Sequence, residues 1–191
     1  MIKTIRYVNL PIVMHWLLAV LVLAMIGIGL SMVELDLPAA TKFRLFQLHK
    51  SIGIVVLLLV PLRLFARAYY RPPALPRSMP GPEQRAALAT HIFLYGAMVL
   101  MPLGGWAMVS LSPRNIPTVL FGLVVWPHIS WLADLESKAT WFEPAVFLHR
   151  AGGWALAAVV VLHVAAALRH HFFIKDNVLW RMLPFWRARP E

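Results

Sequence analysis

Two long segments almost without charged side chains dominate the sequence. Residues 7–33 contain no acidic or basic side chain except His15, and residues 86–113 contain none except His91. Each segment exceeds the about 20 apolar residues that a helix needs to cross roughly 30 Å of hydrocarbon. Because 60% of the chain is hydrophobic and only 14% is charged, well below the charged share of soluble domains, the sequence predicts an integral membrane protein.

The chain contains no cysteine. This excludes disulfides, thiolate zinc sites, cysteine-ligated iron–sulfur clusters and the C-x-x-C-H attachment of c-type haem. Motifs typical of zinc proteases, serine hydrolases, P-loop proteins and Rossmann domains are also missing. The net charge of +10 suggests nucleic acid at first sight, but basic loops set the orientation of a membrane protein, so we expect no nucleic-acid partner.

The hydropathy pattern predicts an all-α membrane protein, a four-transmembrane-helix bundle in which residues 1–191 form a single domain. The expected spans are about 10–32, 46–68, 87–110 and 145–169. The second is the most polar, because Lys50 and Arg63 lie within it, and both side chains should snorkel toward the interfaces. Pro61 should kink this helix near its end.

An uncharged segment at residues 115–133 is the rival for a fifth span. It contains Pro117 and Pro127, and its tryptophans favour the membrane interface. With four spans, the segments on the side of the two termini carry twice as many lysines and arginines as the opposite segments, so both termini should be cytoplasmic. The first span follows Lys3 and Arg6 as in a signal peptide, but it is too long for one, and we expect it to be retained.

Histidines at membrane depth are the chemically informative residues, since ionisable groups in spans are costly and usually mark a function. His149 and His163 lie 14 residues apart on the fourth span, so they face the same side, about 21 Å apart along the axis. The second span starts on the outer side and brings His49 level with His149, whereas the first starts on the inner side and brings His15 level with His163. Two imidazoles on one haem iron leave no open position, which suits electron transfer. The sequence therefore predicts two haem-iron sites, His49–His149 and His15–His163.

Small and basic residues near these histidines are candidates for the haem surroundings. Gly53 and Gly153 each follow a histidine by four residues and would give a flat macrocycle clearance, or else let helices pack closely. Arg67, Arg150 and Arg169 would pair with haem propionates through charge-assisted hydrogen bonds, or else snorkel at the interface.

The remaining histidines have less defined roles. His91 enters the third span at the inner level, where it would replace His15 or His163 as a ligand, or line the inner haem or a quinone pocket. His170 shares roughly the face of His163 at the inner surface. His128 lies in an outer loop, where we expect it to be solvated.

Four stretches of the sequence carry a resemblance to a known family. They are Met14-His15-Trp16, His49-Lys50-Ser51-Ile52-Gly53, the spacing of His149 and His163, and the tail from His170-His171-Phe172 to Leu183-Pro184. The chain resembles, nearly end to end, the bacterial cytochrome b561 group of small di-haem membrane cytochromes. A similar pattern occurs in the cytochrome b subunits of formate dehydrogenases and nickel–iron hydrogenases.

The resemblance implies two b-type haems held by the four paired histidines, in the bacterial inner membrane. Some members resemble superoxide:ubiquinone oxidoreductases, which take electrons from periplasmic superoxide, and this implies ubiquinone as a substrate. A quinone site near the inner haem would be lined by His170, His91 or Trp16.

Three functions are compatible with these observations. The first is an oxidoreductase, or a non-catalytic electron carrier, between a periplasmic donor and membrane quinone. The second is a membrane anchor and electron conduit for a soluble dehydrogenase partner. The third is a divalent-metal transporter whose histidines bind passing ions, although the spans lack the carboxylates expected of one.

Overall fold

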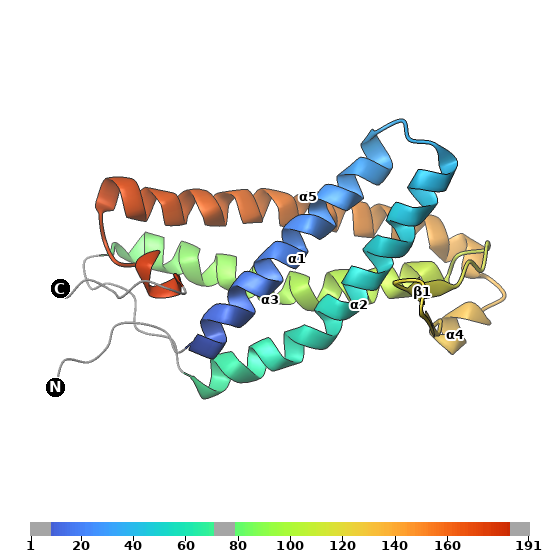
Figure 1. Ribbon diagram of the computed structural model, residues 1–191, viewed down its shortest axis with the longest axis horizontal. Coiled ribbons are helices and arrows are strands. Elements are labelled where there is room, and N and C mark those ends of the chain that lie inside the picture. Colours follow the sequence, from blue (N-terminus) through green and yellow to red (C-terminus); the bar gives the residue numbers. More distant parts are fainter. Residues whose placement is uncertain (1–8, 71–78, 184–191) are drawn as a thin grey trace.

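The computed structural model describes residues 9–70 and 79–183 of the chain. Its four long helices are α1 (Asn9–Glu34), α2 (Ala39–Tyr69), α3 (Gly81–Ser110) and α5 (Lys138–Arg169). Each is long and apolar enough to cross a membrane, and together they form the bundle shown in Figure 1. The prediction of an all-α membrane protein with four membrane-spanning helices is confirmed.

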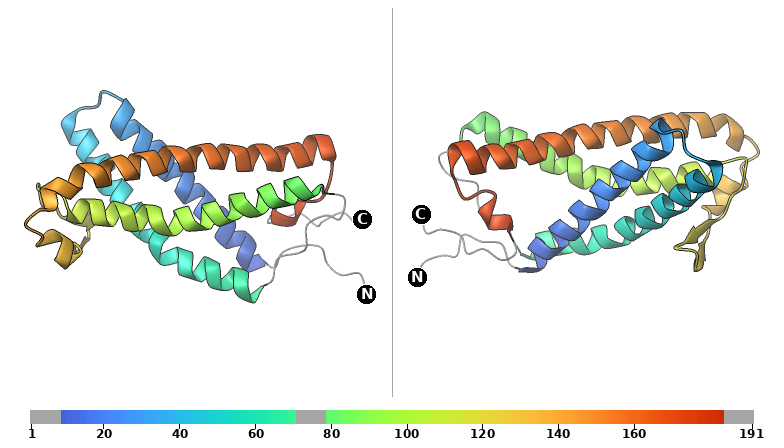
Figure 2. Two further views of the ribbon diagram at one scale, coloured as in Figure 1. Left: turned by 180° about the vertical axis from the view of Figure 1, so that it is seen from behind. Right: turned by 45° about the horizontal axis from the view of Figure 1, so that its top comes forward.

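The long helices pack in pairs. α1 lies against α2 and α3 lies against α5, while α2 also contacts α3. Figures 1 and 2 show α3 and α5 running side by side, with α1 and α2 crossing them at an angle. A buried cluster of Leu18, Val56 and Val60 joins α1 to α2. Large apolar side chains remain exposed along all four helices, as expected of surfaces that face lipid tails.

Three of the helices begin six or seven residues before the predicted spans. α2 begins at Ala39, directly after Pro38, α3 begins at Gly81 and α5 begins at Lys138, whereas the predicted spans began at 46, 87 and 145. Hydropathy marks only the residues that match the hydrocarbon, but the backbone hydrogen bonding of a helix continues into the interface. α2 contains Pro61 and bends along its length (Figure 1), because a proline removes one backbone hydrogen bond and clashes with the preceding turn.

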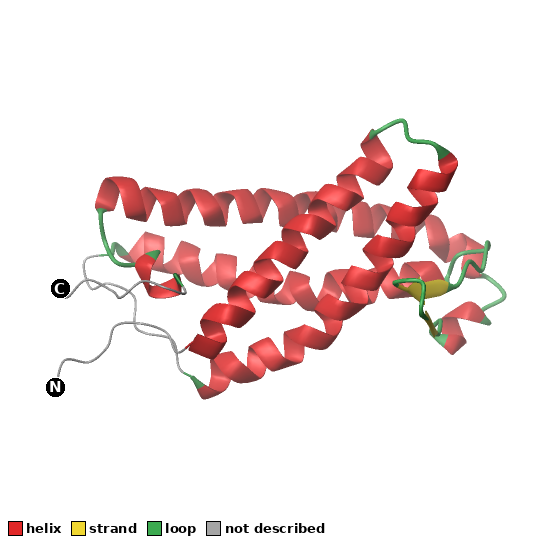
Figure 3. Cartoon of the chain, in the orientation of Figure 1, coloured by secondary structure: helices red, strands yellow, loops and turns green. Residues whose placement is uncertain are grey.

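The segment between α3 and α5 is not a fifth span. It contains an antiparallel hairpin of β1 (Thr118–Leu120) and β2 (Val124–Trp126), followed by the short helix α4 (Ser130–Ala133), as Figure 3 shows. Pro117 and Pro127 flank the hairpin at positions where their missing N–H groups do not interrupt the strand pairing.

Polar side chains of α2 hold this hairpin at the end of the bundle that the sequence predicts to be the outer one. Nε2 of Gln47 donates to the carbonyl of Pro117 (3.0 Å), and Oε1 of Gln47 accepts from the N–H of Val119 (3.2 Å). Nζ of Lys50 donates to the same Pro117 carbonyl (3.1 Å). The ammonium group of Lys50 therefore ends on a backbone carbonyl of the segment that leads into the hairpin.

Ser51 should contribute measurably to the stability of this contact. Its buried Oγ donates to the carbonyl of Gln47 (2.8 Å) and accepts from the N–H of Phe121 (3.0 Å). Ser51→Ala should lower the free energy of unfolding by about 1 kcal/mol, because the Phe121 N–H loses its acceptor in a partly buried hydrogen bond. Thermal unfolding in detergent measures this. Ser31→Ala is the matched control, since Oγ of Ser31 donates to the carbonyl of Gly27 (2.8 Å) but links no second segment of the described chain. Equal losses in both variants would contradict the prediction.

Both ends of the described chain lie at the same end of the bundle (Figure 1). After α5 the backbone forms the π-helical turn η1 (His170–Ile174), passes Lys175 in a left-handed conformation (φ 60°) and folds back into the 3₁₀ turn η2 (Trp180–Met182). Nε1 of Trp16, near the start of α1, donates to the carbonyl of Met182 (2.7 Å). The cytoplasmic location of this end stays a prediction.

Candidate cofactor-binding site

Two pairs of imidazole rings face each other inside the bundle. His49 on α2 lies opposite His149 on α5, with ring centroids 6.2 Å apart and ring planes at 80°. His15 on α1 lies opposite His163 on α5, with centroids 6.3 Å apart and planes at 64°. These are the two pairs that the depth argument brought together, and their role as ligands stays a prediction.

The ring spacing in both pairs suits two imidazoles bound to opposite sides of one metal ion. Bonds between a metal and an imidazole nitrogen are about 2.0–2.1 Å, and the ring centroid lies about 1.1 Å beyond that nitrogen, given ring C–N bonds of about 1.33 Å. Two such arms span roughly 6.2 Å. Rings joined directly by a hydrogen bond would lie about 1 Å closer, because the donor–acceptor distance is only about 2.9–3.0 Å.

Two buried nitrogen atoms of the outer pair have no protein partner. Nδ1 of His49 and Nδ1 of His149 are inaccessible, and no described residue forms a hydrogen bond with either atom. Unsatisfied buried polar atoms are rare and usually accompany strain, chemistry or a bound ion or water. Protein atoms cover both nitrogens, and each lies on the side of its ring that faces a glycine of a neighbouring helix.

Two glycines on neighbouring helices give the outer imidazoles room. A methyl group placed on Gly29 of α1 would lie 3.4 Å from Cε1 of His49, and one on Gly105 of α3 would lie 3.0 Å from Cε1 of His149. The second distance is shorter than ordinary van der Waals contact, so a side chain there would displace the ring. The sequence pattern did not single out these two glycines, because neither lies four residues after a ligand histidine on its own helix. Their depth, level with the outer pair, was the available signal.

The glycines that the sequence singled out face methionines. A methyl group on Gly53 would lie 3.4 Å from Cε of Met25, and one on Gly153 would lie 4.0 Å from Cε of Met101. These glycines therefore let α1 approach α2 and let α3 approach α5, as small residues do between membrane helices. Methionine side chains adapt easily to a neighbouring group, and the predicted role of these glycines beside a macrocycle stays a prediction.

A third imidazole and an indole join the inner pair. His91 on α3 lies with its ring centroid 5.8 Å from that of His163, and Trp16 lies 5.5 Å from His15. The inner level thus gathers aromatic side chains from α1, α3 and α5. Both His91 and Trp16 lie where the sequence predicted the quinone site, and His91 is also close enough to His163 to remain the alternative ligand.

His170 has its partner within the tail. Its Nδ1 lies 2.6 Å from Oδ2 of Asp176, which accepts the hydrogen bond, and both side chains are largely buried. A carboxylate on one ring nitrogen fixes the orientation of the imidazole. His170 is therefore a rigid element of the folded-back tail.

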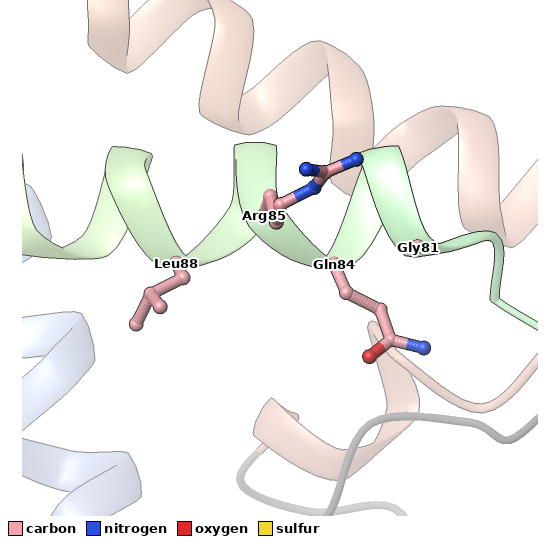
Figure 4. A pocket seen from close by; sticks show the side chains of 4 residues that line it. All are labelled: Gly81, Gln84, Arg85 and Leu88. Carbon is pink, nitrogen blue, oxygen red and sulfur yellow. The ribbon is translucent and has the colours of Figure 1, made fainter.

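A wide-open pocket of about 530 Å³ lies along the start of α3 (Figure 4). Its described lining residues, Gly81, Gln84, Arg85 and Leu88, all belong to this helix. None of the three residues predicted to line a quinone site belongs to this set.

The arginines predicted as haem surroundings have protein partners. Cζ of Arg67 lies 5.1 Å above the ring of Tyr95. Arg150 forms an ion pair with Glu34 at 3.1 Å, in which both side chains are exposed. Exposed ion pairs contribute little energy, so this contact holds Arg150 only weakly, and the predicted contacts with haem stay predictions.

Arg63 is buried, and the prediction that it snorkels is wrong. It is only 6% exposed, and its Nη1 donates to the carbonyl of Pro11 at 2.6 Å. α1 packs over this part of α2 and covers the side chain. The sequence could not show this, because burial depends on which face of α2 meets α1.

The prediction that His128 is solvated is also wrong. Its Nε2 is buried and has no hydrogen-bond partner among the described residues. The loop around it is tied to α3, where Nε1 of Trp106 donates to the carbonyl of Pro127 (2.8 Å) and Oγ of Ser110 accepts from the N–H of Ile129 (2.9 Å). These contacts hold this part of the loop against the bundle, and His128 is half-buried.

The fold and the paired histidines define the class of protein. A four-helix membrane bundle with imidazole pairs at two depths, and no cysteine for covalent attachment, has the architecture of a membrane cytochrome with b-type haem. The family model described as prokaryotic cytochrome b561 matches residues 6–185, and the chain therefore belongs to the prokaryotic cytochrome b561 family.

Curated relatives agree with this assignment. The chain is 32% identical over 178 residues to "Cytochrome b561 homolog 2" of Escherichia coli (strain K12), and this match covers 93% of this chain and 91% of the relative. It is 27% identical over 188 residues to "Cytochrome b561 homolog 1" of the same organism, which covers 94% and 97%. It is 31% identical over 182 residues to the "Probable superoxide oxidase CybB" of Yersinia pestis, which covers 94% and 96%.

The protein is thus a multi-pass bacterial membrane protein and a b-type cytochrome that carries electrons. Bound haem supplies reversible one-electron chemistry, and the chain supplies ligands, orientation and a low-dielectric surrounding.

Proposed function

We propose that this cytochrome holds two b haems and passes electrons between a donor on the outer side and ubiquinone near the inner side. His49 and His149 would hold the outer haem, and His15 and His163 the inner one. The observation that carries the proposal is the ring spacing of 6.2 and 6.3 Å in two pairs at two levels of α5. In this topology the inner side is the cytoplasm and contains both termini.

The chain has the features that such a conduit requires. α5 contributes one ligand at each level, and a helix is a rigid spacer that keeps the two histidines about 21 Å apart along its axis. Gly29 and Gly105 leave room for the outer rings. Two imidazoles on each iron leave no position for oxygen, which suits electron transfer without oxygen binding.

Superoxide is the proposed donor. The Yersinia pestis relative is named a probable superoxide oxidase, and this name carries the proposal, since the outer segments of this chain hold six basic residues against five acidic ones. Each superoxide anion would give up one electron and leave as dioxygen. Ubiquinone would take up two such electrons and two protons, at a site that we place beside His91, Trp16 and His170.

The other two functions have no specific support. No contact in the described chain indicates a dehydrogenase partner. Among residues 9–70 and 79–183, no group of three or more histidine or acidic side chains is arranged to hold a bare metal ion, so metal transport gains nothing from the structure.

The haem-to-protein ratio of the detergent-purified chain tests the proposal. We expect about two b haems per chain and a sharp six-coordinate spectrum after reduction with dithionite. In proteoliposomes, superoxide added outside should then reduce ubiquinone. A single haem would make one histidine pair structural, and no haem after expression with adequate haem supply would refute the proposal. Two haems without superoxide-dependent ubiquinone reduction would refute only the proposed donor and acceptor.

A further inference from the structure

Arg63 is a buried charge at the inner level of the membrane. It lies in the second half of α2 between the fully buried Val60 and the buried Ala66, and is itself only 6% exposed. Arginine side chains at membrane depth normally extend toward the interface, because an unpaired charge in hydrocarbon is costly. This arginine instead lies beneath α1.

Among the described residues, Arg63 has no counterion. A guanidinium carries five N–H donors, and the hydrogen bond from Nη1 to the carbonyl of Pro11 (2.6 Å) uses one of them. No carboxylate in the described chain forms an ion pair with Arg63, whereas Glu34, Glu83 and Asp176 pair with other residues. A buried charge is expected to have a partner, since leaving it uncompensated costs several kcal/mol.

The position of Arg63 points to the inner histidines. Pro11 precedes His15 by one helical turn of α1, so the hydrogen bond to the Pro11 carbonyl brings the guanidinium to the turn that carries His15. The charge also lies within electrostatic range of the His15 and His91 rings. Any anion that Arg63 binds would therefore lie beside the inner site.

We propose that Arg63 binds a propionate carboxylate of the inner haem, an inference that rests on the proposed inner haem. Arginine suits this role because its planar guanidinium matches a carboxylate and stays charged when buried. Such charge-assisted hydrogen bonds are roughly twice as strong as neutral ones. The positive charge would also make it easier to add an electron to the inner haem.

A potentiometric titration of both haems in the purified holoprotein tests this role. Arg63→Gln keeps a donor for the Pro11 carbonyl but removes the charge, and Arg63→Lys keeps the charge. The inner haem, identified as the one lost in His15→Ala, should shift to a more negative midpoint potential in Arg63→Gln and shift clearly less in Arg63→Lys. The outer haem should not shift. Arg44→Gln, which removes an exposed arginine from the same helix, should leave both potentials unchanged.

Two results would overturn the inference. One is an inner-haem potential that stays at the wild-type value in Arg63→Gln, and the other is an equal shift in the Gln and Lys variants, since a structural role for the Pro11 contact predicts no dependence on charge. If Arg63→Gln does not accumulate, a second measurement tests the inference. Wild type and Arg63→Lys are prepared with haem labelled at the propionate carboxylates, and their infrared redox-difference spectra are compared. The carboxylate band should differ between the two proteins, and an identical band would overturn the inference. Failure of the proposed function would give a different result. The wild-type chain would then contain no haem whose binding depends on His15, whereas failure of the inference leaves that haem in place.

Discussion

Alanine at either member of a histidine pair should remove one haem, and the two members of a pair should remove the same one. His49→Ala and His149→Ala should each lower the haem content from about two to about one per chain and abolish the same spectral component. His15→Ala and His163→Ala should abolish the other. The reason is geometric: each pair has the ring spacing of two ligands on one metal, and loss of one ligand leaves iron with a single protein bond.

Haem extraction and low-temperature reduced-minus-oxidised spectra measure both quantities. His128→Ala is the control, because His128 lies in the outer loop and belongs to neither pair, and it should retain both haems. Loss of the same haem spectral component in the His49 and His163 variants would contradict the predicted assignment of ligand pairs. Loss of the inner component in His91→Ala but not in His15→Ala would make His91 the ligand.

A side chain at Gly105 should selectively weaken the outer haem site. A methyl group at this position would already lie 3.0 Å from Cε1 of His149, so the larger side chain of Gly105→Val would push the ring out of line with His49. Overpacking of this kind costs about 1–3 kcal/mol, which corresponds to roughly a 5- to 150-fold loss of outer-haem affinity. The inner haem should be retained.

The adjacent residue supplies the control. A methyl group on Gly104 would meet no atom within 4 Å, so Gly104→Val changes the same helix by the same side chain without touching the ring. Haem content after competition with apomyoglobin, a haem acceptor, reports the affinity. Equal retention of the outer haem in the two variants would show that His149 does not depend on the space at Gly105.

The class of fold and the candidate ligands were readable from the residues alone. Hydrocarbon thickness is a fixed length, so uncharged segments of sufficient length identify spans without knowledge of the packing. Once four spans are given, alternation of direction sets the depth of each residue, and depth alone matched His49 with His149 and His15 with His163. The prolines at 117 and 127 likewise separated the hairpin segment from the spans.

Features that depend on helix rotation were not readable. The neighbours of Gly29 and Gly105 are rings on other helices, and the burial of Arg63 requires the contact between α1 and α2. Lys50 was expected to snorkel toward the interface, and its acceptor is a carbonyl of the hairpin 67 residues away in sequence.

The sequence by itself determined the number of spans, the depth of each histidine and the absence of covalent haem attachment, because these follow from local hydropathy and residue type. Only the tertiary structure decided which glycines face the imidazoles, which arginine is buried at the inner level and where the tail returns to α1. In a membrane, lipid tails are as apolar as the helix surfaces, so hydrophobicity does not indicate which face of a helix meets its neighbour. That choice depends on side-chain fit and hydrogen bonds between segments far apart in the chain.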